Sequence, residues 1–528
     1  KQTSLNKSRS LKMIKKLILN ICFVLCFNLI IAQTINDAIT YNLTDLTGSA
    51  RFSAMSGAFG ALGGDLSAIT INPASSSVFL VNQLSFSSIL YENKINTNFS
   101  NTASQKNATN PTTGTIPYPT FHINHLGAVF VFNNNNKNEN WSRVSLSYNF
   151  NDKKRYNNSY SVEGNNSNGL DNYFLYYANG LKLSDLDLYE DETISDVYKI
   201  LGDEIGFGAQ QAFLGYQSYL INPVDFNPNN DKYVSNAVYK NLSNYMMVKT
   251  KGYNSIHSLN LSGLYKDFIH LGININIHEI EYENYNRFVE QNFSEKSNVT
   301  EVAFDNTLNS KGDGLSFQFG LIAKINKNIR LGIYYDSPQW IKIKEKYKQE
   351  IVVYYIENTS YITEKIKPDI ITFYDPYNIQ IPSKKNISLA YIFKRGLLNI
   401  DYGIKNYGKT IFKDPSNKTS NYFNNLNNQI NSELKSTNNL RIGGEYIIGL
   451  FSIRAGFFNE KSFQNKININ NSAVSWGLGL NFKRSSIDIA FVENKTKNSY
   501  NLFPVELTNK YYVNKVKNQI IFTYNLKL

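Results

Sequence analysis

Alternation of apolar with small or polar residues is the dominant pattern of this chain from residue 83 to its end. It is clearest in the segments 144–150, 271–277, 315–321 and 474–482. Successive side chains of a β-strand point to opposite faces of a sheet, so each segment predicts a strand with one apolar and one polar face. The chain is therefore predicted to be an all-β protein.

Two architectures fit such strands, and the connections between them favour one. A soluble sandwich would close an apolar core between two sheets, whereas a transmembrane barrel has strands of about ten residues with apolar side chains outside. Short turns occur here at 266–267, 325–327, 394–396, 449–450 and 483–486. Long connections lie between them, at 93–117, 153–253, 285–311, 338–384, 405–438, 459–472 and 495–514. Outer-membrane barrels alternate short periplasmic turns with long external loops, so residues 83–528 predict an antiparallel barrel of about fourteen strands.

The N-terminal 32 residues have the form of an export signal. Met13 is followed by Lys15 and Lys16, then by an apolar run over 17–31, and then by Ala32-Gln33. A positive region, an apolar region and a small residue at the cut are typical of a secretory signal peptide. The alternative is a transmembrane anchor, but the run is short for a span. We expect an extension and signal peptide over 1–32, cleavage near Ala32/Gln33, and a mature protein integral to the outer membrane.

Removing this leader changes the charge and the cysteine content. It takes away six basic residues and no acidic one, so the net charge falls from +12 to +6. The remaining basic residues are scattered, which does not predict a nucleic-acid partner. Cys22 and Cys26 both lie in the leader, so a mature chain has no disulfide, no thiolate metal site and no cysteine nucleophile.

Residues 33–82 do not alternate and are rich in small residues. The segment contains Gly57, Gly60, Gly63, Gly64 and Asp65, and it ends with Asn72, Pro73 and Ala74. Small residues permit close backbone packing in a confined space such as a barrel lumen. A phosphate-binding loop would need G-x-G-x-x-G or GK[ST] spacing between a strand and a helix, and neither is present. The segment is predicted to be a hatch that plugs the lumen.

Several of these residues together resemble the long-chain fatty acid transporter family of outer-membrane proteins (FadL/TodX-like). The matching positions are 57–65, Ser67-Ala68, 72–74, Gly332 through Ser337-Pro338, Pro382, Arg441-x-Gly443-x-Glu445-Tyr446 and Arg454-x-Gly456. The Asn-rich composition and the leader resemble proteins of the Bacteroidota. The resemblance implies a fourteen-stranded barrel with an N-terminal hatch, passive uptake of hydrophobic compounds such as long-chain fatty acids, and sideways release through a kinked strand. Ser75 stands where the family usually has Gly.

Relatives of the same fold serve without transporting lipid, notably the PorV-like shuttle of type 9 secretion. The resemblance therefore leaves a second function open: a non-transporting barrel subunit or adaptor of a secretion or assembly machine. The expected partners are outer-membrane lipid, a hydrophobic small-molecule ligand and, for the adaptor, an outer-membrane protein complex.

One polar cluster is predicted in the lumen. If 449–450 is a two-residue hairpin turn, Glu445 pairs with Arg454 across the strands, and both point inward. Arg441 faces the same way, about 13 Å further along at ~3.3 Å per residue. The cluster has two interpretations: a gate or carboxylate-binding site that holds the hatch or a ligand head group, and a structural pair that neutralises buried charge.

The longest insertion, 153–253, is predicted to be partly helical. Thr193 can cap a helix whose apolar face contains Ile194, Val197, Tyr198 and Leu201. A second helix would place Phe213, Tyr216, Tyr219 and Leu220 on one face and stop at Pro223. The resemblance implies that such external helices capture ligand first, whereas the alternative is a self-packed lid.

No catalytic or metal-binding set emerges from the spacing of polar residues. His122 and His125 are three residues apart, so on a regular strand they face opposite sides and cannot chelate one ion. No Ser/His/Asp set and no carboxylate pair can be selected. We expect no enzyme activity, no cofactor and no metal.

Overall fold

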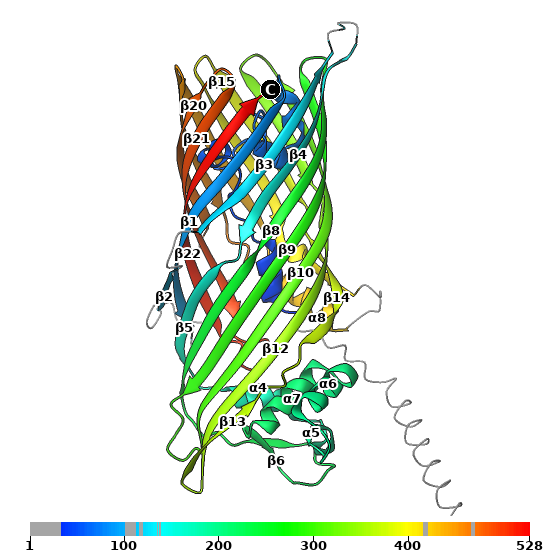
Figure 1. Cartoon of the computed structure of the whole chain (residues 1–528), viewed down its shortest axis with the longest axis vertical. Helices are drawn as coiled ribbons and strands as arrows, with labels where there is room; N and C mark the ends of the chain where they lie inside the picture. Colours follow the sequence, from blue (N-terminus) through cyan, green and yellow to red (C-terminus); the bar gives the residue numbers. More distant parts are fainter. Residues whose placement is uncertain are drawn as a thin grey trace, which may run out of the picture.

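A closed antiparallel β-barrel forms most of the molecule (Figure 1). The computed structural model describes residues 33–100, 112–115, 120–134, 136, 139–414, 421–465 and 470–528, and the predicted leader lies outside them. The wall has fourteen strands, as predicted. The last strand pairs with the first over all 17 residues of the first, which leaves no open sheet edge. In order around the wall the strands are β1 (Gln83–Phe99), β3 (Thr120–Asn133), β4 (Trp141–Arg155), β8 (Leu242–Tyr265), β9 (Ile269–Gln291), β10 (Val299–Lys324), β11 (Ile329–Asp336), β15 (Lys384–Phe393), β16 (Gly396–Asn406), β18 (Ser436–Ile448), β19 (Phe451–Glu460), β20 (Asn471–Asn481), β21 (Ser485–Asn501) and β22 (Lys510–Lys527).

The two ends of the barrel differ. The short turns lie at the end that carries the C-terminus, at the top of Figure 1, which we name the turn end. At the opposite loop end, further strands extend the wall: β2 (Thr112–Thr115), β5 (Asn158–Asn166), β12 (Gln339–Glu357), β13 (Ser360–Ile366), β14 (Thr372–Ile381) and β17 (Ile411–Lys413). β11 gives way to β12 at Ser337-Pro338, and β14 to β15 at Pro382-Ser383. Proline has no N–H to donate, so both breaks fall where the ladder cannot continue.

A band of exposed apolar side chains surrounds the half of the barrel nearest the turn end. On β9 the band consists of Leu271, Ile273, Ile275 and Ile277, each at least 40% exposed. The matching outward positions of β16, β20 and β22 are also large and apolar, for example Leu398, Trp476 and Phe522. Such a belt is the surface that a transmembrane barrel presents to lipid tails.

The strands continue far beyond this band, and there the polarity of their faces is inverted. β9 and β10 have 23 and 26 residues, whereas about 9–11 residues cross a bilayer. Past Ile277, the outward side chains of β9 are Glu279, Glu281 and Glu283, while Ile280 and Tyr282 point inward and are buried or nearly so. Most of the expected loops at 285–311 and 338–384, and parts of 153–253, are therefore strand in the structure. Their charged residues are compatible with strands because the outer face there meets water.

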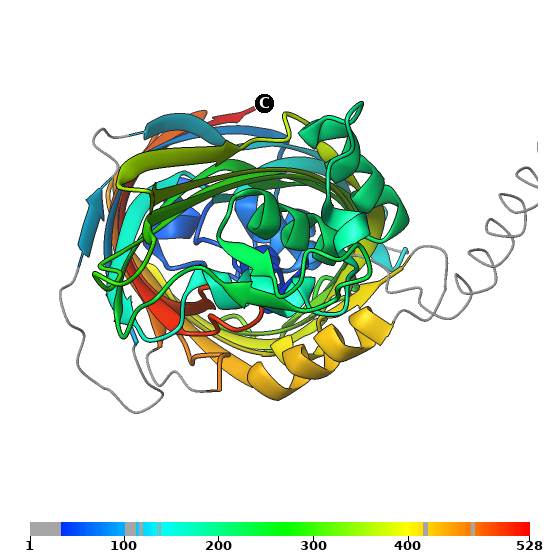
Figure 2. The same cartoon turned by 90° about the horizontal axis from the view of Figure 1, so that it is seen from below.

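Helical segments occupy the lumen and the loop end. The hatch contains α2 (Ile35–Asn42), α3 (Ala50–Ala54), η1 (Ser67–Thr70) and η2 (Pro73–Val78). The insertion after β5 contains α4 (Leu170–Ala178), α5 (Leu183–Leu186), α6 (Ile194–Glu204), α7 (Phe207–Gln217) and the hairpin β6 (Ile221–Pro223) and β7 (Tyr233–Ser235). After η3 (Tyr407–Lys409), α8 (Asn421–Glu433) lies along the wall. Figure 2, seen from the loop end, shows the hatch inside the ring and α4–α7 across the mouth. No helix in the described part of the chain is long and apolar enough to cross a bilayer.

Candidate functional site

The hatch rests on a ring of glycines that face the lumen. A Cβ on Gly443 or Gly456 would meet the backbone of Met55, and one on Gly332 would overlap Gly60. The complete ring, which we name the glycine seat, consists of Gly272, Gly320, Gly332, Gly443, Gly456 and Gly477. At each of these positions the added atom would lie closer than 3.0 Å to a hatch atom. The seat lets hatch backbone approach the wall at a distance that no side chain would permit.

Hydrogen bonds to the hatch backbone fix its position in the seat. The Asp401 carboxylate of β16 accepts from the N–H groups of Phe59 and Gly60 at 3.1 Å. Asn72 Nδ2 donates to the Gly60 carbonyl at 2.6 Å and to the Leu321 carbonyl of β10 at 3.2 Å. Because Asn72 bonds both the hatch and the wall, it ties the two together.

The Asn72-Pro73-Ala74 triplet has a separate local role. Asn72 Oδ1 accepts from the Ala74 N–H at 3.1 Å and so caps η2, while Pro73 occupies the first helical position, where its missing N–H is not needed. The Pro73 carbonyl accepts from Asn260 Nδ2 of β8 at 2.9 Å. Ser75, the departure from the family pattern, is fully buried and donates to the Ala68 carbonyl at 3.4 Å.

A network of four charged side chains joins the hatch to the wall near the turn end. Arg51 Nη2 of α3 lies 2.7 Å from Glu445 Oε2, and Arg454 Nη2 lies 3.3 Å from Glu445 Oε1. Arg454 Nη1 also lies 2.7 Å from Asp488 Oδ1. The side chains of Glu445, Arg454 and Asp488 are at most 4% exposed. The two positive charges are balanced by two negative charges, which offsets the cost of removing these ions from water.

A second ion pair holds the hatch nearer the loop end. Asp45 Oδ2 lies 2.7 Å from Lys517 Nζ of β22, and both side chains are buried. Burial alone would raise the pKa of Asp45, but Lys517 and Lys515 lower it to about 2. By contrast, burial raises the pKa of Asp65 in spite of the nearby Arg51. Asp45 therefore anchors the hatch as a carboxylate.

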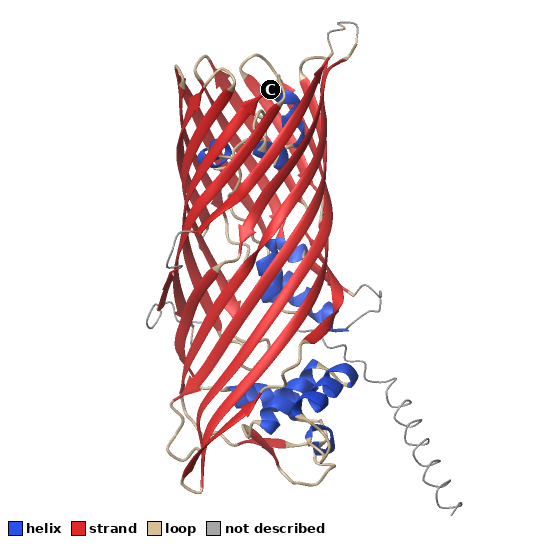
Figure 3. Cartoon of the chain, viewed as in Figure 1, coloured by secondary structure: helices blue, strands red, loops and turns tan. Residues whose placement is uncertain are grey.

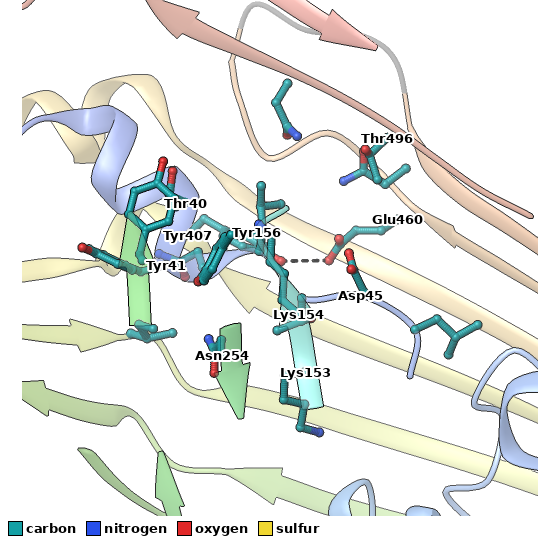
Figure 4. A pocket seen from close by; sticks show the side chains of 18 of the residues that line it. Thr40, Tyr41, Asp45, Lys153, Lys154, Tyr156, Asn254, Tyr407, Glu460 and Thr496 are labelled. Atoms are coloured by element: carbon teal, nitrogen blue, oxygen red, sulfur yellow. Dashed lines mark hydrogen bonds between the residues drawn. The ribbon is translucent and has the colours of Figure 1, made fainter. Parts of the chain in front are cut away.

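A cavity of about 350 Å³ lies between the hatch and the loop end (Figure 4). Its size is within the ~300–1,000 Å³ of ordinary ligand pockets. The apolar and aromatic part of its lining includes Ile95, Tyr160, Met246, Ile256, Tyr282, Tyr500, Leu502, Tyr511 and Val513. Ile95, Met246 and Val513 also belong to the apolar core beneath the helices of the mouth. We name this cavity the chamber.

The rest of the chamber wall carries an excess of positive charge. The basic lining residues are Lys153, Lys154, Lys384, Lys405, Arg441 and Lys515, and the acidic ones are Asp37, Asp45, Asp336 and Glu460. The basic groups lie toward the hatch: the Lys153 carbonyl accepts from the Asp45 N–H at 2.9 Å, and Lys515 follows Val513 toward the turn end. Glu460 accepts from Tyr407 Oη at 3.1 Å (Figure 4).

Arg441 is the chamber residue with the most unused hydrogen-bonding capacity. Its guanidinium carbon lies 5.2 Å from the centre of the Phe458 ring. Among the described residues, its buried Nε and Nη1 atoms have no hydrogen-bond partner. Buried polar atoms normally have partners, so the Arg441 side chain that lines the chamber keeps unused donors.

Comparison with known proteins gives a structural match but no sequence match. No protein-family model and no curated protein sequence matches this chain. Among solved structures, a FadL homologue of Pseudomonas aeruginosa aligns with a TM-score of 0.54 and 11% identity, covering 92% of this chain and 99% of that chain. The toluene transporter TodX of Pseudomonas putida aligns over 92% of this chain and 99% of that one, with a TM-score of 0.48 and 13% identity. This chain has a FadL-like fold.

Within this FadL-like fold, the predicted hatch residues are in contact with the wall or with one another. Gly57 and Gly63 have positive φ angles of 72° and 65°, which favour glycine. Gly60 lies against Asp401 and Asn72, and the Gly64 carbonyl accepts from Arg51 Nη1 at 3.1 Å. Asp65 accepts from Ser49 Oγ at 2.8 Å.

The predicted lumen cluster is divided between two places. Glu445 and Arg454 face each other across β18 and β19, as the hairpin register requires. Arg441 does not join them and instead lines the chamber. Sequence reasoning missed Arg51 and Asp488, which complete the network. Alternation with Ile487 and Ile489 places Asp488 on the lumen face, but the sequence has no signal for Arg51, because its proximity to the wall depends on how the hatch packs in the barrel.

The helices of the mouth form a packed lid made of α4–α7. Phe174 packs on Phe304 of β10 at 5.3 Å between ring centres, and Tyr198 Oη donates to Gln349 Oε1 of β12 at 2.8 Å. Phe503, between β21 and β22, packs on Tyr173 at 5.0 Å. The lid therefore contacts the adjacent strands β10 and β12 and the connection between β21 and β22.

The residues predicted to capture ligand lie within this lid. Val197, Tyr198, Leu201, Phe213 and Leu220 are buried in its core, and Ile194, Tyr216 and Tyr219 pack on that core. α6 begins after Thr193, which caps it as predicted. α7 ends at Gln217, so Tyr219 and Leu220 lie beyond the helix, contrary to expectation, and Tyr219 has a φ of 66°. In this structure the apolar faces are covered, so capture by them requires the lid to move.

One expectation about histidines is wrong. His122 and His125 both face the lumen, because a β-bulge shifts the register between β1 and β3 at this point. His122 Nε2 lies 2.9 Å from Asp152 Oδ2, and His125 is buried against Ser87. Within the described ranges, no group of three His, Cys, Asp or Glu side chains is placed to hold a metal ion.

Proposed function

We propose that this protein is an outer-membrane channel for hydrophobic compounds that carry an anionic head group, such as long-chain fatty acids. The observation that carries the proposal is the chamber, whose lining combines apolar side chains beneath the lid with six basic side chains. The apolar belt supports placement in a membrane, and the FadL-like fold supports the general class. In this proposal the loop end faces outward, and the signal peptide is removed near Ala32/Gln33.

The chemistry of the chamber would orient such a ligand. The acyl chain would lie against Ile95, Met246 and Val513, where it leaves water for an apolar surface. The head group would reach Arg441, which lines the same space. A charge-assisted hydrogen bond contributes about 1.5–3 kcal/mol, roughly ten- to a hundredfold in affinity.

Passage requires movement at both ends of the chamber. The lid covers the mouth, and the hatch is held by the glycine seat and by two sets of ion pairs. Ligand would enter as the lid shifts. It would leave the chamber as the hatch loosens, or sideways where β11, β12, β14 and β15 are interrupted by proline.

The test compares a fatty acid with the alcohol of the same chain length, both binding to the protein in detergent. We expect the acid to bind at least tenfold more tightly to the wild type. Lys384→Gln/Arg441→Gln should remove that difference, whereas the outward-facing pair Lys385→Gln/Lys409→Gln should preserve it. Equal affinity of acid and alcohol would contradict the head-group site, and absence of binding to either would contradict the channel.

A second function is favoured by the closed state of the barrel. The lumen is filled by the hatch on one side and covered by the lid on the other, and a barrel that serves as an adaptor in a secretion or assembly machine needs no open path. Crosslinking in the native outer membrane followed by mild extraction tests it. A stoichiometric protein partner with no small ligand would favour the adaptor over the channel.

A further inference from the structure

A row of four lysines follows the apolar belt on the outer face of β12. Lys342, Lys344, Lys346 and Lys348 alternate with the inward-facing Ile341, Ile343, Glu345 and Tyr347, and all four lysines are exposed. We name these four residues the lysine ladder. From it, we propose that this face of the barrel binds the phosphate groups of a phosphorylated glycolipid in the outer leaflet of the surrounding membrane.

The position of the ladder relative to the membrane is the first argument. Trp340, directly before it, is 45% exposed and packs edge-to-face on Phe317 of β10. Exposed aromatic side chains at the border of an apolar belt mark the membrane interface of a barrel. Each further lysine lies about 6.6 Å along the strand, or about 5 Å in height for a strand tilted by ~40°. The ladder therefore covers the first ~20 Å outside the apolar belt.

The charge environment of the ladder is the second argument. In the part of the chain that the structure describes, none of the four lysines forms an ion pair, whereas Lys311 on the neighbouring β10 is paired with Glu281 at 2.7 Å. Asp313 is the cross-strand neighbour of Lys342, and Asn309 is that of Lys346. Lys346 Nζ lies 5.1 Å from the centre of the exposed Phe373 ring of β14. Four like charges in one row repel each other, and an external polyanion would remove that repulsion.

The distance of the ladder from the apolar belt indicates which kind of lipid can reach all four lysines. A simple phospholipid head group extends about 5–8 Å beyond the hydrocarbon core, which reaches the height of Lys342 but not that of the other three lysines. A glycolipid with phosphates on its sugars extends far enough to meet the whole row. The proposal needs the barrel to lie in the outer membrane with its loop end outward, but it does not depend on channel activity.

The experiment places the full-length protein in nanodiscs that contain phosphatidylcholine with a small fraction of a lipopolysaccharide whose core sugars are phosphorylated. Retained lipopolysaccharide is measured by native mass spectrometry after release into detergent. A lysine near an anionic surface contributes about fivefold in affinity, so Lys342→Gln/Lys344→Gln/Lys346→Gln/Lys348→Gln should weaken binding at least tenfold. The matched control, Lys94→Gln/Lys249→Gln/Lys327→Gln/Lys483→Gln, removes four exposed lysines elsewhere and should bind like the wild type.

Three results would overturn the proposal. The first is unchanged retention by the ladder variant when its barrel is folded, as judged by the shift between heated and unheated samples on a gel. The second is an equal loss in the control variant, which would indicate a general effect of net charge. The third is equal retention of the dephosphorylated lipopolysaccharide by the wild type, which would show that the contact does not involve phosphate.

Discussion

Replacing Gly443 by Ala should loosen the hatch without unfolding the barrel. A Cβ at this position would lie 2.6 Å from the Met55 carbonyl oxygen and 2.8 Å from the Met55 Cβ. An ordinary contact needs about 3.4 Å or more, so Met55 must move by nearly 1 Å. It has little room to do so, because Gly456 also lies directly against its backbone. Inserting a methyl group into a packed site of this kind costs about 1–3 kcal/mol.

The neighbouring glycine supplies a matched control. Gly444 lies on the same strand but faces outward, and its added Cβ would meet the Leu398 side-chain tip at 2.9 Å and the Leu397 carbonyl oxygen at an ordinary contact distance of 3.6 Å. Leu398 is 52% exposed and can turn aside. We therefore expect Gly444→Ala to be neutral or slightly stabilising, because alanine loses less backbone entropy than glycine on folding.

The assay is hydrogen exchange of residues 48–64, followed by mass spectrometry in a lipid nanodisc. A cost of about 1–3 kcal/mol predicts exchange about 5- to 150-fold faster in Gly443→Ala than in the wild type. Exchange of the belt segment 271–277 should not change in either variant. If Gly443→Ala and Gly444→Ala exchange alike, the glycine seat does not hold the hatch.

Three further predictions concern the hatch and the lid. The lowered pKa of Asp45 means that its pair with Lys517 stabilises the hatch above the unfolded pKa of about 4, and that this contribution disappears as the pH falls through about 2. A dye on Thr44→Cys should report hatch release over this interval. Asp45→Asn should reduce the pH dependence, and the remainder would belong to the Arg51–Glu445 pair. Glu445→Gln removes a negative charge that balances Arg51 and Arg454, so it should lower the free energy of unfolding by about 3–5 kcal/mol. Urea unfolding followed by gel shift measures this, and an unchanged midpoint would contradict the role of the network. Phe213→Ala in the lid core should destabilise the lid by about 3–5 kcal/mol. Hydrogen exchange should become faster over 170–217 and stay unchanged over 271–277. Equal acceleration in both segments would show that the lid does not unfold separately from the barrel.

The class of fold could be predicted from the sequence because a bilayer imposes a simple rule. Side chains such as Leu271 and Ile273 must face lipid, and the alternation that this requires is visible in the chain without any knowledge of contacts. The short turns are local as well, and the register of Glu445 with Arg454 follows from the two residues between their strands. The cap at Thr193 is another local signal, since it depends only on the next three residues.

The sequence also contains patterns that indicate the full length of the strands and one further helix, but the sequence-based predictions did not include them. Beyond the membrane the alternation continues with reversed polarity, as in Lys342 and Lys344 outside and Ile341 and Ile343 inside. Charged residues in this pattern look like a loop when every strand is assumed to face lipid. Likewise α4 has Leu170, Tyr173, Phe174 and Tyr177 at helical spacing, but it lacks a side-chain cap.

Only the tertiary structure decided where the functional groups meet. Arg51 is separated from Glu445 by 394 residues, and the fold of the hatch inside the barrel brings them together. The chamber likewise depends on the path of the hatch, the packing of the lid and lining residues from many strands. Alternation shows on which face of a strand a residue lies, whereas the volume left in the lumen and the partners of Arg441 depend on contacts between segments far apart in the sequence. The sequence by itself therefore determined the barrel, and the packing of hatch and lid within it determined the site.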